Sequence, residues 1–400
     1  MLTLVNARLI DPETDEARPG GMVIAEGRIQ ELLTDSTQGR GTGRIVDCDG
    51  KWLAPGIIDI GVKIGEPGER HKESFRTAGA AAAAGGVTTM VTRPDTSPAI
   101  DTPEGLEFLL HRSVEAGPVR VMPMAALTKG REGAEMTEIG FLMDAGAVAF
   151  TDARAVANVR VFQRCLTYAA GLGALIIGHP QDPVLSAGAC ATSGPFASQL
   201  GLPSVSPMAE RIGLERDLAI VEMTGARYHA DQISTARALP ALARAKAAGL
   251  AVTAGCSIHH LTLNEFDIGD YRTFFKLTPP LRSEDDRIAM VEAVMAGAIG
   301  VPILIHQQGG DPAVIAATVG CGKHRRPAPR HGVSPDHGRP WAASSSARAA
   351  ILPRLLDASG LSPVRRRRSL WTLPVMSALR ILTPSSRRRS PTSHGMGPGI

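Results

Sequence analysis

Early in the sequence, an apolar run, a helix-forming run and a second apolar run follow one another in quick succession. Residues 53–60 are largely apolar and bounded by turn residues, which predicts a buried strand. Residues 74–84 are rich in Ala and lack Pro, which predicts a helix that Gly85 and Gly86 would end. Residues 87–91 predict a second buried strand. This order is typical of a βαβ unit and therefore predicts a parallel sheet.

The alternation of strand-like and helix-like segments continues to about residue 300. It is the pattern of a TIM-like (β/α)₈ barrel, whose chemistry sits at the C-terminal ends of the strands. We therefore predict an α/β fold with the barrel over residues 53–305. The expected strands are 56–60, 87–91, 119–124, 147–151, 174–178, 226–230 and 250–254. The expected helices beyond the first unit are 104–116, 155–171, 208–224, 234–248 and 285–298.

The sequence has a different texture on either side of the barrel segment. Residues 1–52 contain short runs of alternating apolar and polar residues separated by Pro, Gly and Asp, which predicts a small β-sandwich part. Residues 306–400 are rich in Arg, Pro and Ser and have little amphipathic period. Residues 321–400 alone carry a net charge of +13, so the first 320 residues carry −9 of the overall +4.

Three interpretations of the basic tail remain open. A cationic arm that binds nucleic acid is one, but the tail has almost no aromatic side chains to stack on bases. Genuine disorder is the second. The third, which we favour, is a GC-rich gene read in a shifted frame, because such a shift yields this mixture of Arg, Pro, Ala, Ser and Gly. A shifted frame would leave the barrel incomplete, with exposed sheet edges.

Composition points to a soluble cytoplasmic protein. No apolar span of 18 residues is present, and the N-terminus does not have the pattern of a signal peptide. No membrane association is expected. The cysteines are scattered without a C-x-x-C pair, which favours buried free thiols over disulfides or a zinc knuckle. They are Cys48, Cys165, Cys190, Cys256 and Cys321.

A series of motifs in register along residues 1–300 carries a family resemblance. The segment PGIIDIGVKIGEPGE begins at residue 55, and RPDT, GAVAFTDA, LIIGH, RYHADQISTA, IHHL and KLTPPLR begin at 93, 146, 175, 227, 258 and 276. The series resembles the dihydroorotases of the amidohydrolase superfamily. The resemblance implies a metal-dependent hydrolase barrel preceded by a small β-sandwich domain.

The resemblance also shows which metal-binding positions are changed. In the family, Asp-x-His-x-His supplies two zinc ligands; the matching residues are Asp59, Gly61 and Lys63, so both histidines are missing. A third histidine of the family is Gln232 here. Asp152 and His179 match retained ligand positions and are the metal candidates. Because catalytic zinc sites keep about three protein ligands, two survivors argue against a tight site.

The positions that hold the substrate in the family are changed as well. Its carboxylate-binding Arg is Gly65, and its two substrate-facing Asn residues are Asp95 and Thr278. A carboxylate cannot donate a hydrogen bond and repels an anion, so Asp95 is expected to pair with Arg93 instead. The family's strand 8 Asp has no counterpart in the altered tail. No catalytic or substrate-binding residue is therefore predicted.

The retained segments serve turns, helix starts and packing. They include Glu66-Pro67-Gly68, Ala209-Glu210, Arg216-Asp217, His229 and Pro279-Pro280-Leu281-Arg282. Random decay would not separate losses and retentions in this way. This separation is expected of a protein whose fold is maintained for its surface while its pocket residues are free to change.

This sorting gives two hypotheses for function. The match is closest to inactive dihydroorotase-like proteins that accompany aspartate transcarbamoylase, which implies a structural partner of that enzyme's catalytic subunit in pyrimidine biosynthesis. An oligomer without a cofactor, and no nucleic-acid partner, would follow. The alternative is a divergent metal-dependent cyclic amidohydrolase, with zinc held by Asp152 and His179, that converts dihydroorotate and water to N-carbamoyl-aspartate.

Overall fold

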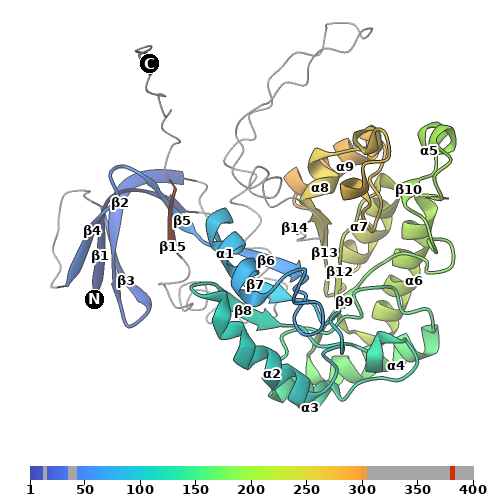
Figure 1. Cartoon of the computed structure of the whole chain (residues 1–400), viewed down its shortest axis with the longest axis horizontal. Helices are drawn as coiled ribbons and strands as arrows, with labels where there is room; N and C mark the ends of the chain where they lie inside the picture. The colour runs from blue at the N-terminus through green and yellow to red at the C-terminus, as the bar shows by residue number, and fades with distance from the viewer. Residues whose placement is uncertain (12–15, 35–42, 300, 304–378, 383–400) are drawn as a thin grey trace, which may run out of the picture.

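A computed structural model shows a small β-sheet domain beside a larger barrel of strands and helices (Figure 1). The structure describes residues 1–11, 16–34, 43–299, 301–303 and 379–382. The predicted α/β barrel with a small N-terminal β domain is confirmed. No described helix combines the length and the hydropathy that a membrane span requires.

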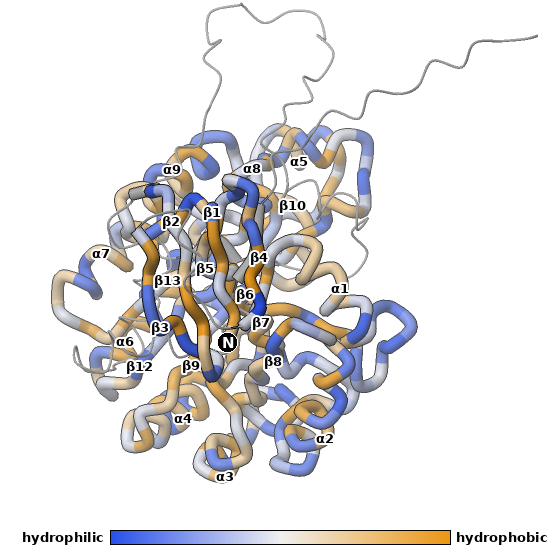
Figure 2. Tube along the Cα trace, turned by 90° about the vertical axis from the view of Figure 1, so that its left-hand side faces the viewer, coloured by the Kyte–Doolittle hydropathy of each residue, from blue (hydrophilic) through white to orange (hydrophobic). Residues whose placement is uncertain are grey.

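The N-terminal sheet is organised around β1, which pairs antiparallel with β2 and parallel with β4 and β5. Its apolar side chains form a separate small core that includes Leu4, Leu9, Met22, Ile24 and Leu53. Figure 2 shows this sheet in front of the barrel, with hydrophobic and hydrophilic positions mixed along its strands. The strands are β1 (Leu2–Asp11), β2 (Glu16–Ala25), β3 (Arg28–Leu33), β4 (Arg44–Asp47) and β5 (Trp52–Pro55).

One short strand from the C-terminal range joins this sheet. β15 (Leu379–Leu382) pairs antiparallel with β5 and extends the sheet at that edge. These four residues form a strand and lie within the tail that the sequence predicts to be frame-shifted or disordered. The remainder of that predicted tail, and the interpretations placed on it, lie outside the described residues.

The barrel strands run parallel in the order of the chain. β6, β7 and β8 form one group, and β9, β12, β13 and β14 form another. Phe150 bridges Ala125 on one side and Ile176 on the other, so residues around 150 take the position of a fourth strand between the groups. The strands are β6 (Ile57–Val62), β7 (Val87–Thr92), β8 (Arg120–Pro123), β9 (Leu175–Gly178), β12 (Arg227–Ala230), β13 (Val252–Ser257) and β14 (Val301–Ile303).

Helices surround the strands and bury one face against them. The major helices follow the predicted order, and three short ones, α3, α5 and α8, were not predicted. The helices are α1 (Phe75–Gly85), α2 (Pro103–Ser113), α3 (Ile139–Asp144), α4 (Val159–Leu172), α5 (Pro195–Leu200), α6 (Met208–Thr224), α7 (Leu239–Ala247), α8 (Ile258–Thr262) and α9 (Glu284–Met295). Two short strands, β10 (Ala191–Thr192) and β11 (Ser204–Val205), pair outside the barrel.

Caps explain where several helices begin and end. The Ser74 hydroxyl accepts from the backbone N–H of Thr77, and Gly86 ends α1 in the left-handed conformation, as the sequence predicts. The predicted helix 155–171 begins later, because the Asn158 side chain accepts hydrogen bonds at the first turn of α4. The predicted helix 234–248 also begins later, at residue 239, because residues 234 and 235 bind a buried carboxylate instead.

Apolar side chains fill both sides of the strands. The larger core lies between strands and helices and includes Met90, Phe150, Ile176 and Tyr228. Alternate positions on the same strands form a second cluster inside the barrel, built from Ile58, Ile60, Val91, Met122, Met124, Ala149, Leu175 and Ile177. The barrel interior is therefore packed up to the strand ends, where a site would have to open.

Candidate functional site

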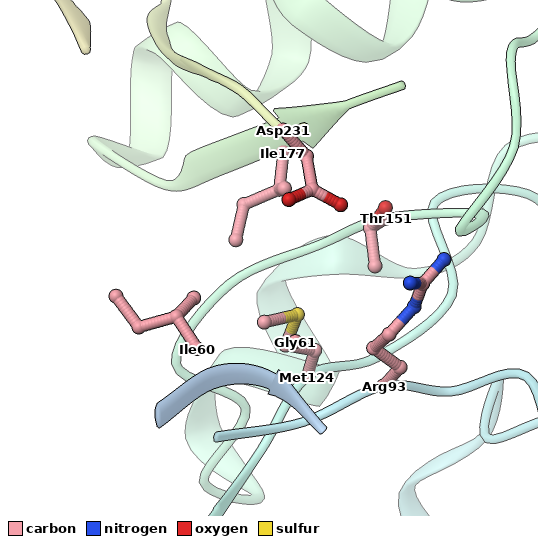
Figure 3. Close-up of a pocket in the computed structure, with 7 residues that line it drawn as sticks. All are labelled: Ile60, Gly61, Arg93, Met124, Thr151, Ile177 and Asp231. Atoms are coloured by element: carbon pink, nitrogen blue, oxygen red, sulfur yellow. The ribbon is translucent and has the colours of Figure 1, made fainter. Parts of the chain in front are cut away.

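A narrow pocket lies at the C-terminal ends of the barrel strands (Figure 3). It has no room for a water molecule. Pockets for small molecules usually offer roughly 300 to 1,000 Å³, so this pocket is too small for a cyclic amide. The lining residues are Ile60, Gly61, Arg93, Met124, Thr151, Ile177 and Asp231.

Gly61 forms a bulge near the end of β6. The pairing of β6 with β7 changes register between Ile60 and Val62, and Gly61 has φ +98°. Residues with a Cβ atom rarely adopt this backbone conformation. A histidine at position 61 would therefore be strained here, so the change at this position involves the backbone as well as the side chain.

The chain folds closely over Gly65, the position where the resemblance places a substrate-binding Arg. The backbone N–H of Glu69 donates to the Gly65 carbonyl oxygen at 2.6 Å. A Cβ atom added to Gly65 would lie 2.4 Å from the Glu69 carbonyl oxygen and 3.1 Å from that of Glu73. This tight turn leaves no room for a side chain, so position 65 cannot bind a carboxylate through one.

Lys63 and Asp95 form an ion pair, with Nζ 3.3 Å from Oδ2. Glu69 lies at 4.0 Å on the other side of the Lys63 ammonium. Arg93, the partner predicted for Asp95, is present but more distant, with Nε 3.9 Å from Oδ1, and it also donates to the Ala153 carbonyl oxygen at 3.0 Å. A protonated amine held between carboxylates has no lone pair for a metal, as expected for Lys63.

Both carboxylate oxygens of Asp152 bind the loop that follows β8. Oδ1 accepts from the backbone N–H groups of Leu127 at 3.0 Å and Thr128 at 2.9 Å, and Oδ2 accepts from the Thr128 hydroxyl at 2.5 Å. Burial raises the pKa of Asp152, while the hydrogen bonds from Thr128 and Leu127 act against that rise. Asp152 thus fixes a loop, and Oδ2 accepts one hydrogen bond, so it keeps a lone pair.

His179 follows β9 and is buried, and both of its ring nitrogens lack a hydrogen-bond partner among the described residues. Burial, together with the positive charges of Arg93 and Arg282, lowers the pKa of His179 to about 3. The imidazole is therefore neutral at neutral pH, which is the form that binds metals. Of the two candidate ligands, both ring nitrogens of His179 are without a partner among the described residues, whereas both Asp152 oxygens already accept hydrogen bonds.

Asp231 is a pocket residue that the sequence analysis did not single out. Its backbone N–H donates to the carbonyl oxygen of Gly178, so Asp231 and His179 follow neighbouring strands. The carboxylate faces the pocket (Figure 3), and burial raises its pKa to about 6, against the influence of Arg93. An Asp directly after a predicted strand was the available signal. Gln232 donates to Asp231 Oδ2 at 3.3 Å and offers no histidine ring.

Two further histidines support the barrel. Nδ1 of His229 lies 2.8 Å from the Thr253 hydroxyl on the neighbouring strand, and Nε2 of His260 lies 3.1 Å from the Pro280 carbonyl oxygen. Burial lowers the pKa of His229 to about 4 and that of His260 to about 3. Both rings are neutral and connect adjacent segments, which matches the structural role predicted for His229.

Glu210 lies at the centre of a buried polar network and is 0% exposed. Its carboxylate accepts from the backbone N–H groups of Ser234 and Thr235, each at 2.9 Å, and from both hydroxyls. It also accepts from Gln181 at 3.0 Å, and Arg282 lies 3.5 Å away as its counter-ion. The network connects α6 to the loops after β12 and β13.

Other retained residues also stabilise the fold. The Tyr228 hydroxyl donates to Asp217 Oδ2 at 2.7 Å, and Arg216 donates to Asp217 Oδ1 at 2.7 Å. Glu66 accepts from Arg112 at 2.7 Å and from the backbone N–H of Phe75 at the start of α1. The prediction that retained motifs serve helix starts and packing agrees with these contacts.

Two substrate positions of the family lie away from these contacts. Thr278 is exposed on the loop before Pro279. The strand 8 Asp of the family would follow β14, and the chain after residue 303 lies outside the described residues.

Known proteins resemble this chain in both sequence and fold. A family model described as dihydro-orotase-like matches residues 50–238. A dihydroorotase of Syntrophobacter fumaroxidans is 37% identical over 73% of this chain and 66% of its own length. A dihydroorotase-like protein of Pseudomonas putida is 36% identical over 76% of this chain and 72% of its own length. The chain belongs to the dihydroorotase-like family.

The match spans about two thirds of the length of these dihydroorotase-like relatives. Solved structures agree on the fold. An L-hydantoinase from Arthrobacter aurescens superimposes with a TM-score of 0.65 at 20% identity, over 75% of this chain and 68% of that one. A D-hydantoinase from a Thermus species gives 0.59 at 22% identity, over 76% and 69%.

The residues of this dihydroorotase-like chain do not fit the zinc that the family implies. Positions 61, 63 and 232 carry Gly, an ion-paired Lys and Gln, and the Asp152 oxygens are already hydrogen-bonded. Within the described part of the chain, no three His, Cys, Asp or Glu side chains converge on a point that could hold an ion. A zinc site needs about three protein donors, and of the positions matched to the family's ligands only Asp152 and His179 carry one.

Proposed function

We propose that this dihydroorotase-like chain of pyrimidine biosynthesis is catalytically inactive and acts as a structural partner of the catalytic subunit of aspartate transcarbamoylase. We further propose a cytoplasmic oligomer. The observation that carries the proposal is the donor set at the strand ends, where positions 61 and 232 carry Gly and Gln and Lys63 is paired with Asp95. Without a metal, no bound water is activated to attack an amide carbon.

The packing of the pocket supports the same proposal. Ile60, Met124 and Ile177 line this pocket (Figure 3), which is too small for a ring-shaped substrate. The polar residues that remain, such as Glu210 and Arg282, bind one another. These are the contacts expected of a barrel kept for its shape.

A second candidate function is a divergent metal-dependent cyclic amidohydrolase that acts on dihydroorotate. Two observations favour it. Relatives from several bacteria carry the name dihydroorotase, and these names support hydrolysis more directly than they support an inactive partner. His179 also keeps a neutral, buried imidazole with both nitrogens available. Asp152 would be the second ligand of such a site.

Two measurements on the purified full chain separate these candidates. In the first, the chain is mixed with the aspartate transcarbamoylase catalytic subunit from the same genome, and the mass of any complex is followed by light scattering during gel filtration. The second is an assay of dihydroorotate turnover. The structural-partner proposal expects a stoichiometric complex and no dihydroorotate turnover. Turnover that is lost in His179→Ala would establish the second candidate, and a chain that forms no complex would contradict the first.

A further inference from the structure

A groove of about 870 Å³ runs along the exposed face of α4, on the helical outside of the barrel. It is separate from the pocket at the strand ends and shares no lining residue with it. Two arginines lie toward the start of the helix and apolar side chains toward its end, with no Asp or Glu among the lining residues. The main contributors are Met136, Arg160, Gln163, Arg164, Tyr168 and Leu172.

The two arginines form an unusual local charge. Arg160 and Arg164 are one helical turn apart and exposed, and neither guanidinium has a hydrogen bond or ion pair within the described ranges. Like charges at this spacing destabilise a helix. The first 320 residues carry a net charge of −9, so a basic groove without acids contrasts with the rest of this body. An acidic ligand would relieve the repulsion.

The other end of the groove is apolar. Helix α3 approaches α4 closely at Gly140, where an added Cβ atom would lie 3.4 Å from the Tyr168 hydroxyl and 3.8 Å from Leu172 Cδ1. Tyr168 and Leu172 are each 40% exposed, and the neighbouring Phe141 is 67% exposed. The groove thus offers an apolar surface about two helical turns from a pair of positive charges.

We propose that this groove binds an acidic segment of a partner protein. Carboxylates of the segment would pair with Arg160 and Arg164, and an apolar side chain would pack on Tyr168 and Leu172. Arginine suits this role because its planar guanidinium binds carboxylates through two parallel hydrogen bonds. The proposal does not depend on whether the barrel mouth is catalytic, since the two sites share no residue.

The test uses a fluorescein-labelled amphipathic peptide with Glu on one helical face and Leu on the other, titrated against the full chain by fluorescence anisotropy. The charge-reversed double variant Arg160→Glu/Arg164→Glu should bind at least about tenfold more weakly, or about 1.4 kcal/mol. Tyr168→Ala should also weaken binding. The matched control, Arg76→Glu/Arg120→Glu, has the same charge change at exposed positions elsewhere and should bind like the unaltered chain.

Binding should weaken as salt rises, and a peptide with Lys in place of Glu should not bind. The proposal is overturned by equal binding to the charge-reversed variant, or by no binding at millimolar peptide. Circular dichroism confirms that each variant is folded. Gel filtration with light scattering tests the remaining possibility, that a second copy of this chain binds in the groove. If the unaltered chain self-associates and Arg160→Glu/Arg164→Glu abolishes it, a second copy occupies the groove, and the partner-protein proposal is wrong.

Discussion

The Lys63 ammonium lies 3.3 Å from the Asp95 carboxylate, and these two residues stand where the family resemblance places a zinc-binding histidine and a substrate-binding asparagine. The pair is the shortest contact in a group of charges, with Glu69 4.0 Å from Lys63 and Arg93 3.9 Å from Asp95. Position 63 is therefore tied to position 95 by charge, and neither side chain remains available for hydrolytic chemistry.

This relationship predicts a measurable coupling energy. The Lys63 and Asp95 side chains are 29% and 11% exposed, so their attraction is only partly screened by solvent. A double-mutant cycle with Lys63→Ala and Asp95→Ala, measured by urea unfolding, should give a coupling of about 1 kcal/mol. The control cycle at Lys129 and Glu135, which are 51% and 69% exposed, should give a smaller value. Equal couplings would contradict the assignment.

Asp152 is predicted to stabilise the loop after β8. Asp152→Ala leaves the backbone N–H groups of Leu127 and Thr128 without their acceptor, which should lower the free energy of unfolding by about 1–3 kcal/mol. Thermal or urea unfolding in the presence of EDTA measures the effect without any metal contribution. Asp144→Ala, at an exposed position on α3, is the control and should change stability by less than about 0.5 kcal/mol. An Asp152→Ala protein as stable as the control would contradict the prediction.

Asp231 is predicted to make stability depend on pH. Its pKa is raised to about 6 in the folded chain, so the folded state holds a proton that the unfolded state has already released. The free energy of unfolding should therefore fall as pH rises from about 4 to about 6, and Asp231→Asn should remove this component. The difference in unfolding free energy between Asp231→Asn and the unaltered chain isolates the contribution of Asp231. The buried histidines, which destabilise the fold at acid pH, contribute equally to both proteins.

At pH 7 the Asp231→Asn protein should be the more stable of the two, by up to about 3 kcal/mol. Asp285→Asn, at an exposed position on α9, should leave the pH profile unchanged. An Asp231→Asn protein that is less stable at pH 7 would show that the carboxylate has a favourable partner, and the burial argument would fail.

The Glu210 and Arg282 pair is predicted to be essential for folding. Both side chains are almost fully buried, at 0% and 1% exposed, so removing one partner leaves a charge without compensation. Arg282→Met should cost about 3–5 kcal/mol in unfolding free energy. Arg211→Met breaks an exposed pair with Glu215 on α6 and should cost less than about 1 kcal/mol. Similar losses of unfolding free energy in both variants would contradict the prediction that the buried pair stabilises the fold more than the exposed pair does.

Much of the fold could be predicted from periodicity, because buried strands such as 87–91 and helices such as 208–224 are continuous in the sequence. The fourth strand was predicted at 147–151, and backbone hydrogen bonds join this segment to its neighbours, from Val148 to Pro123 of β8 and from Phe150 to Leu175 of β9. The helix predicted from 234 fails because Ser234 and Thr235 bind Glu210, a contact between distant segments. Local pattern does not reveal such contacts.

The site, like the fold, was predicted only in part from the sequence. The resemblance identified positions 61, 63 and 232 as altered, but the bulge at Gly61 and the closed turn at Gly65 depend on backbone geometry that no residue pattern displays. Arg93 was expected to neutralise Asp95, yet Lys63 lies closer because the end of β6 faces the loop after β7. Asp231 was passed over, since no family motif marks its position.

The measurement that tests this account most directly is the zinc content of the purified full chain, determined by elemental analysis after equilibration with zinc and removal of free ion. The donor set at the strand ends predicts far less than one zinc per chain and no difference between the unaltered protein and His179→Ala. One or two zinc ions per chain that disappear in His179→Ala, together with dihydroorotate turnover, would contradict it.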